Sequence, residues 1–181
     1  MGGVCSASGL LVTRIAVLSL VVALASCATP APQTAAPAVA PTAPEAMVAA
    51  IRAAAAHSGE ELAVQPLRDP MVEDLREQAL RLEQQHRYPE AVAALEHALT
   101  LVPGDPALLQ ERAEAALLVG DSAGAARLSH EAWQLGAKLG PLCRRQWETQ
   151  RQIRMATGDG PGTYSAQVQR DACTVAGPAR Y

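Results

Sequence analysis

The sequence predicts an all-α fold, a short array of antiparallel helix hairpins, and three observations support this prediction. Aromatic residues make up only 3 % of the 181 residues and Phe is absent, while alanine, the strongest helix former, dominates the apolar residues. From residue 69 onward, apolar and small residues recur at a spacing of 34. Pro and Gly fall between the repeating segments, where helices begin and end.

The repeat is read from five pairs of residues: Leu75 and Leu109, Ala79 and Ala113, Ala91 and Ala125, Ala98 and Ala132, and Leu101 and Leu135. A period of 34 is that of the helix–turn–helix unit of the tetratricopeptide repeat. Segment 88–103, YPEAVAALEHALTLVP, resembles that family in its Tyr, its alanines and its closing Pro. We expect two clear repeats in which the alanines let paired helices approach closely and leucines such as Leu101 fill the remaining space.

Helix boundaries follow from capping residues. Asp69-Pro70 and Asp105-Pro106 each place an N-cap before a proline at the first helical position. A third, degenerate hairpin is expected from a helical pattern over 142–157, a Gly-rich turn and a return helix over 164–175. The spacing of 34 fails here, so we expect a longer turn and a capping role for this hairpin.

Two cysteines lie at matching ends of the third hairpin. Cys143 is at the start of its first helix and Cys173 at the end of its second, and these ends meet in an antiparallel pair. In an oxidising compartment we predict a Cys143–Cys173 disulfide, which stabilises by about 3–4 kcal/mol in the loop-entropy model. Two buried thiols are the alternative.

The N-terminus carries an export signal. After Arg14, an apolar run over 15–24 ends in Leu24-Ala25-Ser26-Cys27, and this run is too short to span a bilayer. The ending resembles the bacterial lipobox. The resemblance implies that residues 1–26 are a lipoprotein signal peptide and that Cys27 is acylated, which anchors the chain to a membrane. Ala28 rather than Asp after the cysteine implies the outer membrane, with the protein facing the periplasm.

We divide the mature chain into three parts. Residues 27–46, the lipidated cysteine and an Ala/Pro-rich stretch, are expected to form an extended tether. Residues 47–68 contain a short helix and a linker, and residues 69–181 form the repeat domain. The helix starts near Pro44, with Met47, Val48 and Ile51 on one face, and we expect it to be weakly ordered unless it packs on the domain or a partner.

The sequence has no recognisable pattern of catalytic or metal-binding residues. Its four His are scattered, and it lacks the local motifs of Ser hydrolases, zinc proteases and phosphate loops. We therefore predict no catalytic residue, no metal site and no cofactor. A net charge of −3 gives no case for nucleic-acid binding.

The repeat resemblance implies a groove, lined by the first helix of each unit, that binds segments of partner proteins. The groove positions carried over from the family are Glu73, Arg76, Leu80, Glu83, Gln84, Ala107, Gln110, Glu114, Leu117 and Leu118. A secondary basic patch for an acidic partner is predicted at Arg144, Arg145, Arg151 and Arg154, next to Trp147. The alternative is that Trp147 packs inside the cap and these arginines face water or pair with the acidic repeats.

The layout of lipid anchor, tether and short array resembles the short repeat lipoproteins that activate class A penicillin-binding proteins. The resemblance implies a membrane-anchored periplasmic interaction module that activates or adapts a peptidoglycan synthase. A generic scaffold for another envelope assembly, in pilus or secretion systems or in outer-membrane biogenesis, is the alternative, followed by an enzyme acting on the cell wall. The sequence leaves the partner and the oligomeric state open.

Overall fold

A computed structural model describes residues 42–56 and 69–174, all of which lie in one compact unit, Pro41–Tyr181. Within these two ranges the chain forms seven α-helices and no strand. The predicted signal peptide, Cys27 and most of the tether lie outside the described residues, as does the linker 57–68.

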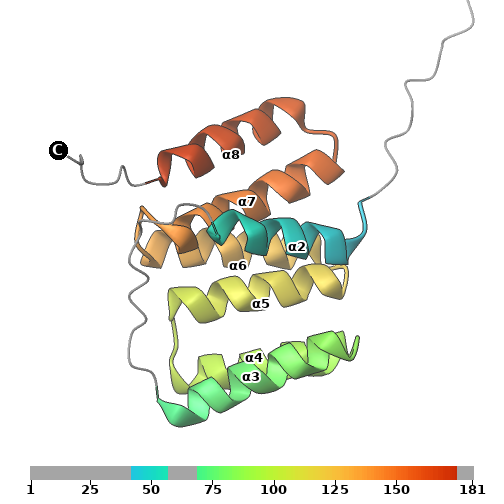
Figure 1. Cartoon of the computed structure of the whole chain (residues 1–181), viewed down its shortest axis with the longest axis vertical. Helices are drawn as coiled ribbons and strands as arrows, with labels where there is room; N and C mark the ends of the chain where they lie inside the picture. The colour runs from blue at the N-terminus through green and yellow to red at the C-terminus, as the bar shows by residue number, and fades with distance from the viewer. Residues whose placement is uncertain (1–41, 57–68, 175–181) are drawn as a thin grey trace, which may run out of the picture. The chain divides into compact units, whose positions relative to one another are not determined.

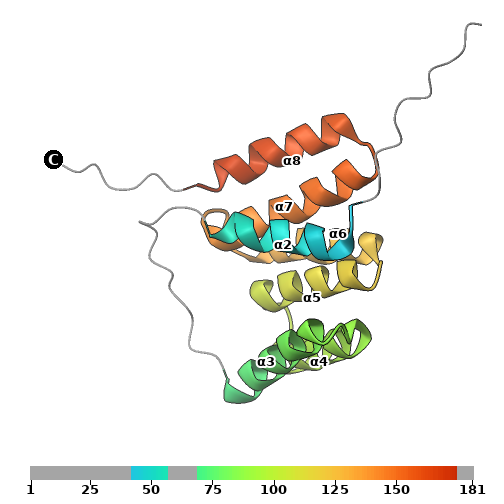
Figure 2. The same ribbon diagram turned by 45° about the vertical axis from the view of Figure 1, so that its right-hand side comes forward.

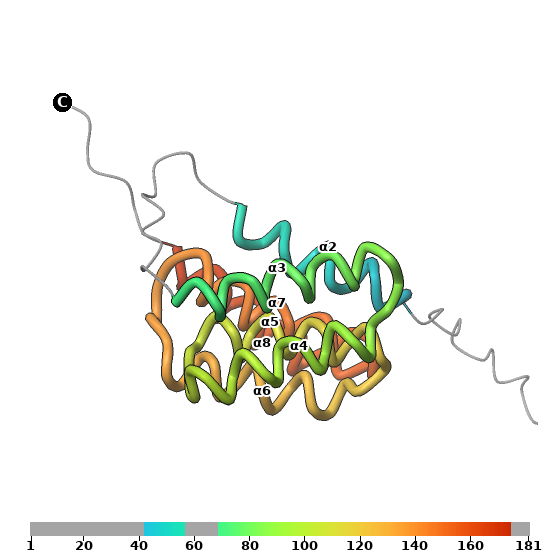
Figure 3. The backbone as a smooth tube through the Cα atoms, turned by 90° about the horizontal axis from the view of Figure 1, so that it is seen from below, coloured from blue at the N-terminus to red at the C-terminus, as the bar shows by residue number. Residues whose placement is uncertain are grey.

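Six of the helices form three hairpins in chain order (Figures 1 and 2). Their bounds are α3 (Pro70–Gln84) with α4 (Tyr88–Leu101), α5 (Pro106–Leu118) with α6 (Ser122–Leu135), and α7 (Pro141–Ala156) with α8 (Gly160–Ala172). The predicted all-α array of helix hairpins is confirmed. Seen from below, α3 lies along one edge of the stack and α4 and α6 along the other (Figure 3). We call the side formed by the first helices, α3, α5 and α7, the groove face.

The turns inside the three hairpins have the same backbone geometry. Each contains one residue in the left-handed region, at His86, Gly120 and Gly158. In each, the next amide donates to the carbonyl five residues earlier, as Asp121 does to Ala116. This closure satisfies carbonyls that the end of a helix leaves unpaired. The predicted Asp69 and Asp105 caps are present, because their side chains accept from Met71 N and from Ala107 N and Leu108 N.

The expected long turn in the third hairpin is wrong. The turn is as short as the other two, and α8 begins at Gly160 rather than at Tyr164. Asp159 caps α8 by accepting from Gly162 N, as Asp121 caps α6 by accepting from Gly124 N. The spacing of 34 fails because α7 has 16 residues where α5 has 13. The Gly-rich segment therefore forms the first turn of a helix.

The core of the first two hairpins is built from small residues, as predicted. Ala79, Ala91 and Ala98 are 2 %, 0 % and 0 % exposed and pack with Leu95 in one apolar cluster. The expectation for Leu101 is wrong, since this last residue of α4 is 42 % exposed.

A seventh helix, α2 (Pro44–Ala55), packs on the groove face against α5 and α7 (Figures 1 and 3). Met47, Val48 and Ile51 are buried, in a cluster that includes Leu117 and the half-buried Ile153. Burying three such side chains contributes on the order of 5–8 kcal/mol before the cost of ordering the helix. The short helix is thus ordered by packing on the domain.

Candidate functional site

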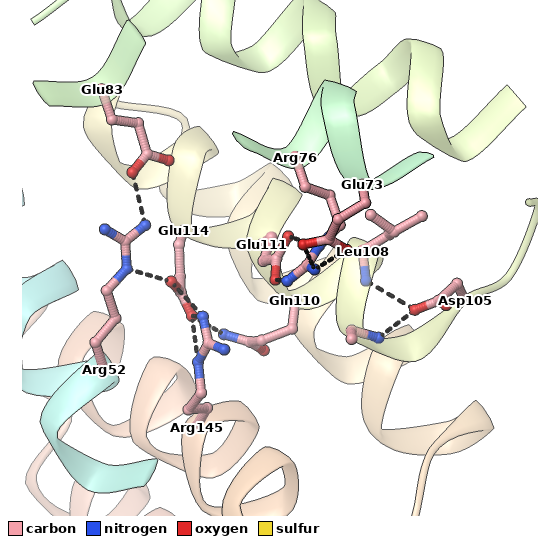
Figure 4. Close-up of polar contacts among 11 residues, drawn as sticks. Arg52, Glu73, Arg76, Glu83, Asp105, Leu108, Gln110, Glu111, Glu114 and Arg145 are labelled. Carbon is pink, nitrogen blue, oxygen red and sulfur yellow. Dashed lines mark hydrogen bonds and ion pairs between the residues drawn. The ribbon is translucent and has the colours of Figure 1, made fainter. Parts of the chain in front are cut away.

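The groove face holds a network of buried charges centred on Glu114 of α5 (Figure 4). Its carboxylate is fully buried. Arg145 of α7 donates two hydrogen bonds to it, from Nε at 2.9 Å and Nη2 at 2.7 Å, and Gln110 Nε2 donates a third at 3.0 Å. Arg52 of α2 adds a fourth, from Nε at 2.9 Å. A buried carboxylate is tolerated when it is paired and hydrogen-bonded in this way.

Arg52 joins three helices through this network. Besides Glu114, it donates from Nη2 to Glu83 of α3 at 2.7 Å. Burial alone would lower the pKa of Arg52, but the carboxylates of Glu114 and Glu83 outweigh burial and raise it. Burial raises the pKa of Glu83, and Arg52 offsets this only in part because Glu114 and Glu111 lie nearby. Arg52 therefore ties α2 to α3 as well as to α5.

Arg144 of α7 binds the same, C-terminal end of α2. Its Nε donates to Ala54 O at 3.1 Å and its Nη2 to Ala55 O at 3.4 Å. These carbonyls are in the last turn of α2, where a cation also complements the helix dipole. At the start of α2, Tyr88 of α4 donates from its hydroxyl to Glu45 Oε1 at 3.0 Å. Polar contacts thus hold α2 in its first and last turns.

Arg76 of α3 forms a second ion-pair group. Its Nε donates to Glu111 Oε2 of α5 at 2.8 Å, its Nη2 also pairs with Glu111, and its Nη1 contacts Glu73 at 2.7 Å. Hydrogen bonds from Arg76 to Glu111, and secondarily to Glu73, raise the pKa of the guanidinium despite its partial burial. This pair links the first two hairpins across the groove face.

A cleft of about 230 Å³ lies between the two ion-pair groups. Ala79 and Leu95 supply apolar surface, α2 contributes Arg52, and the remaining lining residues are charged except for Leu80. They are Glu73, Arg76, Glu77, Leu80, Glu83, Glu111 and Arg145. The cleft is the part of the groove face that α2 leaves open.

The groove positions predicted from the family divide into two sets. Glu73, Arg76, Leu80 and Glu83 line the cleft; Gln84 is exposed and Ala107 half-buried, but neither lines it. Gln110, Glu114 and Leu117 are 0 %, 0 % and 2 % exposed, and Leu118 packs with the residues under α2. The expectation that these α5 residues face a partner is wrong, because α2 and its ion pairs cover them.

The predicted basic patch is also wrong. Arg144 is buried and binds α2, Arg145 binds Glu114, and Arg151 donates to Glu148 at 2.7 and 2.8 Å. Arg154 donates to Gly162 O at 3.0 Å. Arg144, Arg145 and Arg154 bind groups of α2, α5 and α8, whereas Arg151 pairs with Glu148 of its own helix. The alternative, in which the arginines pair with the acidic repeats, holds for Arg145. Trp147 packs edge-on against Trp133, with ring centroids 5.4 Å apart.

Cys143 and Cys173 are joined by a disulfide, with their Cα atoms 5.7 Å apart. The bond ties the start of α7 to the residue that caps α8. In the described ranges, no three His, Cys, Asp or Glu side chains gather to bind a metal ion. None of the helices described is both long and apolar enough to cross a bilayer.

No protein-family model and no curated protein matches this sequence. Among solved structures, the chain is similar to the globular C-terminal domain of P. aeruginosa LpoP, with a TM-score of 0.55 and 25 % sequence identity. The match covers 58 % of this chain and 99 % of that one. The two share a helical fold.

The sequence analysis missed three charged residues of the site, Arg52, Glu77 and Glu111. The apolar pattern of Met47, Val48 and Ile51 is a signal that the helix packs on something. It does not identify the surface, and the next residue, Arg52, binds carboxylates 31 and 62 positions away.

Proposed function

We propose that this protein is a membrane-anchored periplasmic interaction module that activates or adapts a peptidoglycan synthase of the class A penicillin-binding type. The observation that carries the proposal is the likeness of the helical array to the LpoP domain, which supports an adaptor role toward a penicillin-binding protein. The lipobox resemblance at Leu24 to Cys27 supports the same location, an outer-membrane anchor facing the periplasm.

The groove face supports binding rather than catalysis as the activity. Its buried carboxylate Glu114 is paired with arginines of two other helices, and Arg76 of α3 is paired with Glu111 of α5. Such pairs fix the relative positions of the helices. The exposed surface that remains is a cleft with an apolar floor and charged walls, which is the composition typical of a protein-recognition site.

The proposal is tested by reconstitution. Purified residues 28–181 should raise glycan polymerisation or peptide crosslinking by a class A synthase from the same organism. No effect across all class A synthases of that organism would contradict the proposal. In-cell crosslinking of the lipidated protein separates it from the scaffold alternative, because a scaffold for another assembly would capture components of that assembly instead.

The anchor is tested separately. Mass spectrometry of the protein from its native host should find Cys27 as an acylated N-terminus, and Cys27→Ala should release the protein from the membrane fraction. A membrane-bound Cys27→Ala protein would contradict the lipid anchor.

A further inference from the structure

We propose that the cleft between α2 and α3 is the docking site for a partner segment that carries a Lys or Arg beside an apolar side chain. The inference rests on the proposed function for the existence of a protein partner. It places the partner contact in this one cleft, which α2 and the repeats form together, and not along the whole groove of the array.

The first argument is that most of the groove is already filled. α2 buries Met47, Val48 and Ile51 over α5 and α7, and Arg144 and Arg52 hold it by hydrogen bonds. A partner that entered this part of the groove would have to displace a packed helix and leave Glu114 with fewer donors. The cleft beside α3 needs no such displacement.

The second argument is the apolar surface in the cleft. Leu80 of α3 is 48 % exposed, although the residues on either side of it along the cleft are charged. It lies beside the buried Ala79 and Leu95. An exposed leucine in a concave site is a contact point for an apolar side chain, and its burial would favour binding.

The third argument is charge. The three guanidiniums that line the cleft are engaged with carboxylates of the protein; the side chains of Arg76 and Arg145 are each 20 % exposed and that of Arg52 is 38 % exposed. Two of the four lining carboxylates are more accessible than any of these arginines, since the side chains of Glu73 and Glu77 are 45 % and 61 % exposed, whereas those of Glu83 and Glu111 are 8 % and 16 % exposed. The cleft therefore presents acid to a partner, and complementarity selects a cation.

Glu77 is the carboxylate best placed to receive that cation. It pairs with Arg81, one helical turn away at 3.3 Å, and both side chains are more than half exposed. An exposed pair of this kind contributes at most about 1 kcal/mol. A partner Lys or Arg can replace Arg81 at little cost, whereas replacing Arg76 at Glu111 would break a short inter-helix pair.

The experiment is site-specific photocrosslinking in the native host with the full-length, lipidated protein. A benzophenone amino acid is placed at Leu80 in the cleft or, as the reference position, at Tyr164, which is 70 % exposed on α8. We expect a crosslink from Leu80 and none from Tyr164. Sequencing of the crosslinked partner peptide should find a Lys or Arg within a few residues of an apolar side chain.

The matched variants are Glu77→Lys and Glu131→Lys, which make the same charge change on exposed residues of α3 and α6. Glu77→Lys should reduce the Leu80 crosslink at least tenfold, and Glu131→Lys should leave it within about twofold. Both proteins should keep the wild-type melting temperature, because exposed charges contribute little to stability. Glu77→Gln, which adds no positive charge, should give an intermediate loss.

Each experimental outcome supports or contradicts either the cleft assignment or the proposed function. Crosslinking from Tyr164 but not Leu80, an acidic partner segment, or equal losses for the Lys variants would overturn the cleft assignment. A Leu80 crosslink to a basic segment of a protein other than a peptidoglycan synthase would uphold the cleft and overturn the proposed function. If Glu77→Lys still activates a class A synthase fully in reconstitution, the proposed function stands and the cleft assignment fails.

Discussion

The first hairpin, α3–α4, and the last, α7–α8, have the same turn and different interiors. The first is held by apolar packing: Val72, Ala79, Leu82, Ala91 and Leu95 are all buried between its helices and α5. In the last, Ala166 is the one residue of α8 that is buried, and the helix is held by a disulfide and by ion pairs.

Glu148 of α7 is the centre of those ion pairs. It is buried and accepts hydrogen bonds from Arg151, Gln152 and Arg170, the last of which reaches it from α8 at 2.8 Å. One hairpin architecture can therefore be stabilised by apolar burial or by a covalent bond with a buried charge. The two hairpins should therefore lose stability in response to different changes.

The largest expected effect is on the apolar hairpin. Leu95→Ala should lower the free energy of unfolding by about 2–5 kcal/mol, because Leu95 is 2 % exposed in the first core. Leu101→Ala, the same change on the same helix at a 42 % exposed position, is the control and should cost less than about 1 kcal/mol. Urea unfolding monitored by circular dichroism measures both. Equal losses would mean that α4 is not packed as described.

Removing the disulfide should be the next largest effect. The double variant Cys143→Ser, Cys173→Ser should lose about 2–4 kcal/mol, because the unfolded chain is no longer constrained by a bond that closes a separation of 30 residues. Reducing agent should shift the wild-type midpoint to the same extent and leave the variant unchanged. A wild-type midpoint that does not respond to the reductant would show that the bond is absent or contributes nothing.

Acid should weaken the last hairpin through Glu148. Burial alone would raise the pKa of Glu148, but hydrogen bonds from Arg151, Gln152 and Arg170 outweigh burial and lower it. A folded pKa below the unfolded one means that the stabilisation is complete above the unfolded value, about pH 4.3, and is lost as the pH falls through the folded value. Glu148→Gln should make the free energy of unfolding fall less as the pH is lowered, measured by unfolding curves at a series of pH values, and Glu131→Gln should not. Parallel curves for wild type and Glu148→Gln below pH 5 would contradict this role.

The smallest effect tests the shared turn. His86 occupies the left-handed position, at φ 58°, where the other two hairpins have Gly120 and Gly158. His86→Gly should raise the free energy of unfolding by about 0.5–1 kcal/mol, because glycine adopts this conformation without steric cost. The contact of His86 Nδ1 with the Tyr88 hydroxyl at 2.6 Å is exposed and offsets little of the gain. A loss of stability would mean that this contact matters more than the backbone conformation.

The comparison also explains what could be predicted from the sequence. The spacing of Ala79, Ala91 and Ala98 predicts the first two hairpins because apolar packing is what holds them. The third hairpin is stabilised by Glu148 and a disulfide, which impose no apolar period, so its turn and the start of α8 were misplaced. The positions of the two cysteines still predict the pairing of the helices in this hairpin, because a disulfide requires only that the two helix ends meet.

The site was harder to predict than the fold for a physical reason. A helix face with Met47, Val48 and Ile51 can pack on any apolar surface, and an Arg can pair with any carboxylate within reach. The partners of Arg52 and Arg144 are set by the three-dimensional arrangement of α3, α5 and α2, at sequence separations of 31 to 90. Groove positions taken from a family pattern could not reveal that the chain's own helix covers four of the ten, Gln110, Glu114, Leu117 and Leu118.

The contact between Arg144 and α2 is made to main-chain oxygens, those of Ala54 and Ala55. The neighbouring Ala53 is exposed. In the variant Ala53→Cys, a fluorophore attached to the cysteine would therefore lie beside the Arg144 contact without removing it. Energy transfer to a second dye on α4 would report in real time whether α2 stays packed on the domain when the partner binds.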